Sequence, residues 1–186
     1  AYDGKIYLFG GYDDRNSNVV VEYNPATDSW RTRAYMADSR SWATAVTYQD
    51  KIYVIGGQSN VAGHEVVQEY DPNTNTWQNR ASLPSGRFSA GAVVIGDSIY
   101  LVGGFDNSGA AVNDVFEYRP SEDKWYYWDG FDSALAASAV VAVGETLYVI
   151  NGKDGSGRQC QQNKSAIVGS FEPYGDYLHF GSDVIN

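Results

Sequence analysis

The fold is decided by a short stretch, DKIYVIGG at residues 50–57, which recurs along the chain. The other copies are GKIYLFGG at 4–11, DSIYLVGG at 97–104 and ETLYVING at 145–152. Successive copies are separated by about 47 residues, and a constant period of this size indicates a repeat architecture. The chain therefore consists of four similar units.

Each copy predicts a strand that ends at its glycine pair. The run of β-branched and aromatic residues favours a strand buried on both faces. Glycine tolerates positive φ and lets a neighbouring backbone come close, so the pair ends the strand. The fourth copy carries Asn151 in place of the first glycine. We expect these glycines to shape a turn rather than to bind a ligand.

A second block recurs after each of the first three copies, as EYNPATDSW at 22–30, EYDPNTNTW at 69–77 and EYRPSEDKW at 117–125. The proline and the Asx, Ser or Thr side chains that follow it predict a tight turn between two strands. A tryptophan at a fixed place in each repeat is expected to pack between repeats, because its large area is best buried there.

A third block precedes the glycine strand, at residues 36–46, 83–93 and 131–141. Its alternating small residues predict a strand where backbones crowd near a ring axis. Arg40 and Arg87 precede the small residues, and Leu135 takes the third place. A guanidinium group has five donors, so we expect both arginines to bond backbone carbonyls of adjacent turns.

These blocks predict four strands in each repeat. Units of four antiparallel strands, repeated radially, are typical of β-propeller blades. The predicted fold is therefore all-β, with a single domain over residues 1–186. Its repeat units cover approximately 1–35, 36–82, 83–130 and 131–186.

The recurring Gly-Gly pair, the Tyr before the turn proline, the Trp after it and the Arg before the small residues resemble the kelch repeat family. The resemblance covers nearly the whole chain. The fourth repeat departs from the pattern, with a longer loop at 153–165 and Leu178 where tryptophan is expected. The resemblance implies a non-catalytic protein-interaction module like the adaptor, scaffold and actin-binding members. The alternatives are a kelch-propeller enzyme, galactose-oxidase-like or a sugar epimerase, and a structural, self-assembling protein.

The first repeat begins at its glycine strand, so the strand at Ile6–Phe9 is predicted to have an unpaired edge. Propellers close with four to eight blades, and the resemblance implies six or seven. Three outcomes follow. Further chain completes the ring, two copies form one ring of eight blades, or the four repeats close alone or stay open.

Charge and composition restrict the partners. The chain has 13 Lys and Arg against 23 Asp and Glu, a net charge of −10. No basic stripe is visible, so we expect no nucleic-acid partner. No apolar run is long enough to span a membrane, and we expect no membrane partner. Cys160 is the single cysteine and cannot form an internal disulfide. A single cysteine is compatible with a reducing compartment, so we expect a cytoplasmic location, with an extracellular one as the alternative.

The chain has few of the residues that bind copper or zinc in enzymes, with two histidines and one cysteine. His64, His179 and Cys160 lie in different repeats without metal-ligand spacing. We expect the histidines to be exposed loop residues, and we expect no metal and no other cofactor. Serine-nucleophile and phosphate-loop motifs are also missing from the sequence.

Partner-binding residues are implied by the kelch resemblance. In that family, such side chains commonly follow the glycine pair and the repeat arginine, in loops that converge at one end of the central channel. Trp42 and Phe88 are predicted interface residues, with packing inside the blade as the alternative. The full predicted set comprises Tyr12, Asp14, Ser41, Trp42, Gln58, Asn60, Phe88, Ser89, Phe105, Asn107, Lys153 and Asp154.

Overall fold

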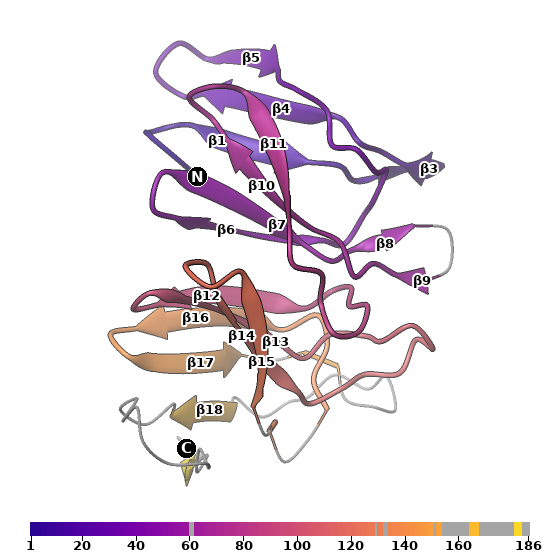
Figure 1. Ribbon diagram of the computed structural model, residues 1–186, viewed down its shortest axis with the longest axis vertical. Coiled ribbons are helices and arrows are strands. Elements are labelled where there is room, and N and C mark those ends of the chain that lie inside the picture. Colours follow the sequence, from indigo (N-terminus) through magenta and orange to yellow (C-terminus); the bar gives the residue numbers. More distant parts are fainter. Residues whose placement is uncertain are drawn as a thin grey trace. The chain divides into compact units, whose positions relative to one another are not determined.

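The computed structural model describes residues 1–59, 62–128, 130–131, 134–150, 152–153, 164–167 and 181–183. Within these ranges every helix or strand element is a β-strand, as the sequence predicts (Figure 1). The chain divides into two compact units, Ala1–Phe88 and Ser89–Asn186. In the part of the chain described, no helix is long and apolar enough to cross a bilayer.

The first unit contains two antiparallel sheets. Its first sheet has three strands in the order β1-β4-β5, and its second has four in the order β11-β10-β7-β6. The strands of the first sheet are β1 (Ile6–Phe9), β4 (Val20–Asn24) and β5 (Ser29–Thr32). Those of the second are β6 (Thr44–Tyr48), β7 (Lys51–Ile55), β10 (Val67–Asp71) and β11 (Thr76–Arg80).

The second unit contains two four-stranded sheets, with their strands in sequence order. The third sheet consists of β12 (Gly91–Ile95), β13 (Ser98–Val102), β14 (Val115–Arg119) and β15 (Lys124–Trp128). The fourth consists of β16 (Ala139–Val143), β17 (Thr146–Ile150), β18 (Lys164–Ile167) and β19 (Gly181–Asp183). Sheets of four antiparallel strands confirm the predicted blade.

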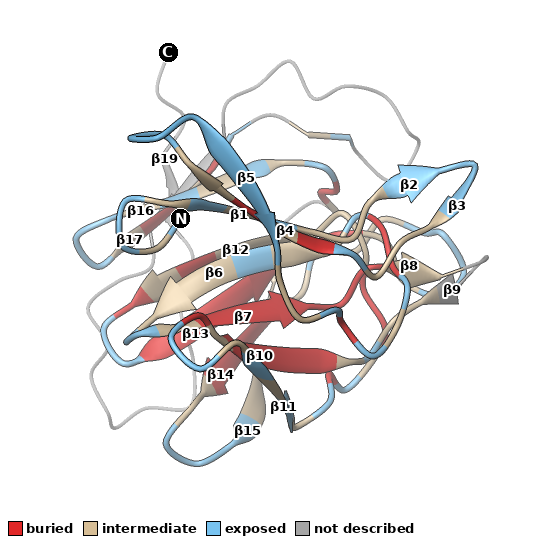
Figure 2. Ribbon diagram, turned by 90° about the horizontal axis from the view of Figure 1, so that it is seen from above, coloured by how far each residue is buried: buried red, intermediate tan, exposed pale blue. Residues whose placement is uncertain are grey.

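Two short hairpins follow the first two glycine pairs. They are formed by β2 (Tyr12–Asp13) with β3 (Arg15–Asn16), and by β8 (Gln58–Ser59) with β9 (Ala62–Gly63). The residues after the first pair are mostly polar, and two residues on each side of Asp14 pair as strands. Both hairpins extend from the same side of the first unit (Figures 1 and 2).

The tyrosine and tryptophan of the second sequence block face each other across a hairpin. The two rings are tilted against each other, with centroids 4.6 Å apart for Tyr23 and Trp30, 4.8 Å for Tyr70 and Trp77, and 4.8 Å for Tyr118 and Trp125. In each turn the tyrosine hydroxyl donates to a residue with positive φ, namely Asp28, Asn75 and Asp123. The block therefore encodes a hairpin with a fixed register.

The strand of small residues begins later than the sequence indicates. β6 starts at Thr44, β12 at Gly91 and β16 at Ala139. The residues before each start form a turn in which Trp42, Ser89 and Ala137 have positive φ. Positive φ cannot continue a strand, so the predicted strand loses its first part to this turn.

The two sheets of the first unit pack through aromatic rings. Phe9 meets Tyr70 edge-on at 5.9 Å and Trp77 at 5.7 Å. The Trp77 indole N–H donates to the carbonyl of Ala34 at 2.9 Å. Trp77 therefore packs between repeats as predicted. For Trp30 the prediction is wrong, because its side chain is 60% exposed.

The second unit has its own apolar core. Val93, Val102 and Val115 of the third sheet pack with Leu147 and Val149 of the fourth. β12 also lies against β16. The apolar side chains of the third and fourth sheets thus form one core between the two sheets.

The first glycine strand is more exposed than the others. Ile6 and Leu8 are 45% and 48% exposed, whereas Ile52 and Val54, at the same places in the second repeat, are 3% and 0% exposed. Figure 2 shows β7 and β10 almost wholly in the colour of buried residues. β1 pairs only with β4 among the described strands, which confirms the predicted unpaired edge. Burial on both faces is therefore correct for β7 and β13. It is wrong for β1 and for β17, which is buried only at alternate residues.

Candidate functional site

In the first three repeats the glycine pair is hydrogen-bonded to the turn that follows it, which carries Arg40, Arg87 or Leu135. The second glycine donates its N–H to a carbonyl of that turn. The bonds run from Gly11 to Arg40 at 3.0 Å, from Gly57 to Arg87 at 2.8 Å and from Gly104 to Leu135 at 2.9 Å. The backbone arrangement persists where leucine replaces arginine. It fixes the turn on which Trp42, Ser89 and Ala137 lie.

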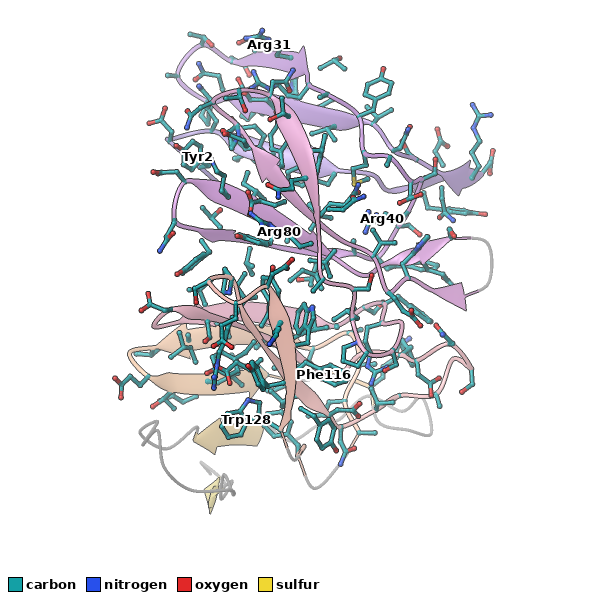
Figure 3. The ribbon with its side chains drawn as sticks, in the orientation of Figure 1. Tyr2, Arg31, Arg40, Arg80, Phe116 and Trp128 are labelled. Carbon is teal, nitrogen blue, oxygen red and sulfur yellow. The ribbon has the colours of Figure 1, made fainter. Side chains whose placement is uncertain are left out.

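Arg40 is a buried structural residue, as the sequence predicts. Its side chain is 0% exposed, and Nη1 donates to the carbonyls of Gly56 and Val66, each at 3.1 Å. Nη2 bonds Gln68 and lies 3.9 Å from the carboxylate of Asp38. Figure 3 shows Arg40 at the end of the sheets from which the hairpins extend. The guanidinium therefore anchors the turn beneath the candidate site.

Arg87 is also buried, and its Nη1 donates to Ser85 Oγ at 2.8 Å and to the Gly86 carbonyl at 3.0 Å. These bonds lie within its own turn rather than reaching the next one. Its main-chain carbonyl still accepts the bond from Gly57. Both buried arginines thus help to hold the loop end of the first unit in place.

Trp42 is held in a strained backbone conformation at the surface. Its φ is 52°, in the left-handed region, which is costly for a bulky residue. The same place in the next repeats carries the small residues Ser89 and Ala137, with φ of 51° and 52°. The Trp42 side chain is 56% exposed. Core packing therefore does not account for a tryptophan at this place.

Three aromatic rings from successive loops form a row, which we call the aromatic row. The ring of Tyr12 is nearly parallel to that of Trp42, with centroids 6.4 Å apart and an angle of 11°. Phe88 lies on Trp42 with centroids 6.1 Å apart and an angle of 35°. Tyr12 is 64% exposed, and Phe88 is partly buried. Trp42 thus lies at the surface rather than inside the blade.

An open pocket of about 320 Å³ lies beside the aromatic row. Hairpin β2–β3, the arginine turn and the start of β8 supply its lining. The lining residues are Tyr12, Asp14, Arg15, Asn16, Trp42 and Gln58. The pocket presents exposed aromatic faces together with a carboxylate, a guanidinium and two side-chain amides.

Ser41 fixes the pocket wall by joining the two hairpins. Its hydroxyl lies 2.8 Å from Asn16 Oδ1 and donates to it. Its backbone exchanges two hydrogen bonds with Gln58, at 3.0 and 2.7 Å. The side chain of Ser41 is buried, and its bonds hold the two hairpins together. Its part in partner binding stays a prediction.

The structure brings together the predicted residues of the first unit. Tyr12, Asp14, Trp42 and Gln58 line the pocket, Ser41 braces it and Phe88 extends the aromatic row. Sequence reasoning missed Arg15 and Asn16 as site residues. They lie on the second strand of a hairpin that the sequence shows only as a polar loop, and Arg15 is paired in register with Asp13.

The remaining predicted residues either belong to the second unit or fall outside the described residues. Ser89, Phe105, Asn107 and Lys153 belong to the second unit. There the Lys153 backbone pairs with Ala136 at 3.0 and 2.8 Å, and Ser89 accepts the N–H of Ala137 at 2.9 Å. Asn60 and Asp154 fall outside the described residues. Their part in binding stays a prediction.

His64 is not the exposed loop histidine that the sequence suggests. It lies partly buried beside the arginine turns, and its Nε2 is buried without a hydrogen-bond partner. Burial, and next the charge of Arg40, lower the pKa of His64, while Asp38 opposes them. Cys160 and His179 lie outside the described residues. Among the described side chains, no three His, Cys, Asp or Glu residues gather in a metal-binding arrangement.

The chain is similar to several known proteins, some of them named for kelch repeats. It is 36% identical over 64 residues to the spermatocyte protein spe-26 of Caenorhabditis elegans, covering 31% of this chain and 11% of that protein. It is 35% identical over 60 residues to the kelch repeat protein M-T8 of Myxoma virus, covering 31% and 12%. Human kelch repeat and BTB domain-containing protein 12 is 32% identical over 65 residues, covering 30% and 10%. The matches thus span about a tenth of each relative.

The fold is similar to that of YjhT, with a TM-score of 0.81 and 16% sequence identity. The alignment covers 98% of this chain and 67% of YjhT. The family described as the KLHDC2/KLHL20/DRC7 Kelch-repeats domain matches residues 1–163. The four sheets are therefore kelch-type propeller blades, and the chain belongs to this kelch repeat family.

Proposed function

We propose that the chain is a non-catalytic protein-interaction module that binds a peptide segment of a partner at the loop end of its blades. The contact is centred on Trp42. The main support is that Trp42 has a strained backbone, with φ of 52°, while its side chain remains 56% exposed. Strained residues persist where the surrounding structure determines them, and they cluster at binding sites.

The surroundings of Trp42 support the same proposal. Exposed aromatic residues that can be buried in a complex are enriched among the residues that dominate binding energy. Tyr12 and Phe88 flank Trp42 to form the aromatic row, and the pocket beside it offers polar groups that fix a ligand's orientation. Arg40 and Ser41 hold this surface rigidly, which reduces the entropy lost on binding.

The relatives support an interaction role in general terms. Several are named for kelch repeats joined to a BTB domain. The peptide ligand, and roles as an adaptor, scaffold or actin-binding protein, are proposals for this chain.

Selection from a displayed library of random peptides tests the proposal. We expect the whole chain to select peptides whose affinity falls about tenfold or more with Trp42→Ser, since truncating a central aromatic contact costs this much. Serine is the residue that the next repeat carries at the same place, Ser89, so the backbone conformation is tolerated. The matched control is Trp30→Ala, which removes a tryptophan of similar exposure on β5.

Peptides that bind equally well to wild type and Trp42→Ser would contradict the proposal. So would an equal loss of affinity with Trp30→Ala, because the contact would then lie on another surface. Far-UV circular dichroism and thermal unfolding of each variant show whether a lost interaction reflects lost folding.

A further inference from the structure

The geometry points to a basic side chain, an arginine of the partner peptide, as the ligand of the pocket beside Trp42. This inference rests on the proposed function and specifies which chemical group the site receives. It follows from the combination of exposed aromatic faces, an exposed carboxylate and side-chain amides around one opening.

The aromatic faces suit a planar cation. Tyr12 and Trp42 are nearly parallel and remain 64% and 56% exposed, so both rings can accept a group at the pocket. The face of an aromatic ring carries negative electrostatic potential and attracts a cation placed over it, most strongly for tryptophan. A guanidinium group is flat and weakly hydrated, and it stacks on such a face better than an ammonium group does.

Asp14 supplies the counter-charge. It is exposed at the tip of hairpin β2–β3, with φ of 55°, and it lines the pocket. Arg15 also lines the pocket and would repel a cation if it were unbalanced. However, Arg15 stands directly opposite Asp13 in the hairpin register, and opposite charges in such a cross-strand position attract. The hairpin as a whole, with Asp13, Asp14 and Arg15, therefore carries one net negative charge, and Asp14 brings a carboxylate to the pocket lining.

The amides orient the rest of the ligand. Ser41 donates to Asn16 Oδ1, which fixes this amide and turns its Nδ2 donor group away from Ser41. Gln58, held through its backbone by Ser41, provides a second amide at the rim. These donors suit the carbonyl groups of a peptide on either side of an arginine. The net charge of −10 adds a long-range attraction for basic partners.

The test uses three blocked peptides that differ at one residue. Acetyl-Gly-Gly-Arg-Gly-Gly-amide is compared with the same peptide carrying citrulline, which keeps the shape and removes the charge, and with one carrying glutamate. The whole chain is labelled with 5-fluorotryptophan, and the Trp42 fluorine resonance is assigned from its loss in Trp42→Phe. Titration followed by fluorine NMR then reports binding at Trp42, with Trp30 as the internal control.

We expect the arginine peptide to shift the Trp42 resonance and leave that of Trp30 in place. Citrulline, and separately Asp14→Asn with the arginine peptide, should each weaken binding by about fivefold or more, as expected for losing the cation or its counter-charge. Asp14→Asn keeps a residue type that tolerates positive φ. Binding of the citrulline or glutamate peptide as strong as that of arginine would overturn the inference. Unchanged affinity in Asp14→Asn, or no shift with arginine, would do the same.

The experiments distinguish failure of the cationic ligand from failure of the proposed interaction module. Selected peptides that depend on Trp42 but contain no basic residue would leave the interaction module standing and overturn the cationic ligand. Selected peptides that bind independently of Trp42 would overturn the proposed function itself.

Discussion

The carbonyl oxygen of Arg40 lies 2.2 Å from the place that a Cβ atom on Gly10 would occupy. The same closeness recurs between Gly56 and Arg87, at 2.4 Å, and in the second unit between Gly103 and Leu135, at 2.1 Å. The first glycine of each pair is therefore required by contact as well as by its positive φ. In the first unit this contact joins the glycine strands β1 and β7 to the turns that carry Trp42 and Phe88.

Gly10→Ala is expected to destabilise the fold by about 3 kcal/mol or more, because the methyl group would collide with backbone that cannot move cheaply. Gly4→Ala is the matched control. Gly4 has a similar φ of 68° against 63° for Gly10, but its Cβ would meet nothing within 4 Å. We expect it to cost only about 1 kcal/mol, from the left-handed conformation alone. Urea unfolding of both variants checks the difference, and equal losses would show that contact is unimportant.

Arg40→Lys is expected to destabilise the fold, although it keeps a positive charge at this position. Arg40 bonds two carbonyls and Gln68 from one planar group, and a lysine ammonium cannot reproduce that geometry. We expect a loss of about 3 kcal/mol, since buried partners are left unsatisfied. Arg31→Lys, on the exposed strand β5, is the control and should change stability by less than about 0.5 kcal/mol. Denaturant midpoints that are equal for the two variants would contradict the structural role of Arg40.

Trp77→Ala is expected to destabilise the chain by about 3 kcal/mol or more, because it removes the indole that packs on Phe9 and bonds Ala34. Trp30 has the same place in the preceding repeat but is 60% exposed, and its described ring contact is with Tyr23. Trp30→Ala should therefore cost only about 1 kcal/mol. Thermal unfolding distinguishes the two, and a larger cost for Trp30 would mean that its face is covered in solution.

The repeat period and the turn chemistry predict most of the fold. Four-stranded sheets, the Tyr–Trp hairpins and the buried Arg40 all follow from residues that return at equal spacing. The sequence alone does not show which of two equivalent residues is buried. Trp30 and Trp77 occupy the same place in successive repeats, but Trp30 is exposed and Trp77 packs on Phe9. Whether a side chain is buried depends on the presence of a neighbouring sheet, which one repeat does not encode.

The candidate site is predicted in part for a related reason. Residues after each Gly-Gly pair and each arginine do gather in the first unit, which brings Tyr12 to Trp42. Asn16 was not predicted, because its role depends on a hairpin only two residues long on each side. Strands this short carry no readable alternation of apolar and polar residues. The strained φ of Trp42 is likewise invisible in a sequence where the same place holds Ser89 and Ala137.

Stability should fall as the pH is lowered through the range in which histidine titrates, because of His64. Burial first, and then the positive charge of Arg40, lower the pKa of His64 from its ordinary 6.5, with the carboxylate of Asp38 opposing this. Its buried Nε2 has no hydrogen-bond acceptor that would stabilise a proton. Below pH 6.5 the unfolded chain therefore binds a proton that the folded chain resists. Since the unfolded state binds more protons there, the free energy of unfolding decreases as the pH falls from 6.5 towards the lower folded pKa.

Urea unfolding at about pH 7.5 and about pH 5.5 measures this loss, over a range in which few carboxylates titrate. His64→Gln removes the titrating group but keeps a polar side chain, and we expect the loss to shrink in this variant. His179 is the only other histidine and is unchanged, so the difference between wild type and variant isolates His64. An identical loss in both proteins would place the pH dependence elsewhere. A wild type that becomes more stable at the lower pH would mean that His64 gains a partner when protonated, with Asp38 outweighing Arg40.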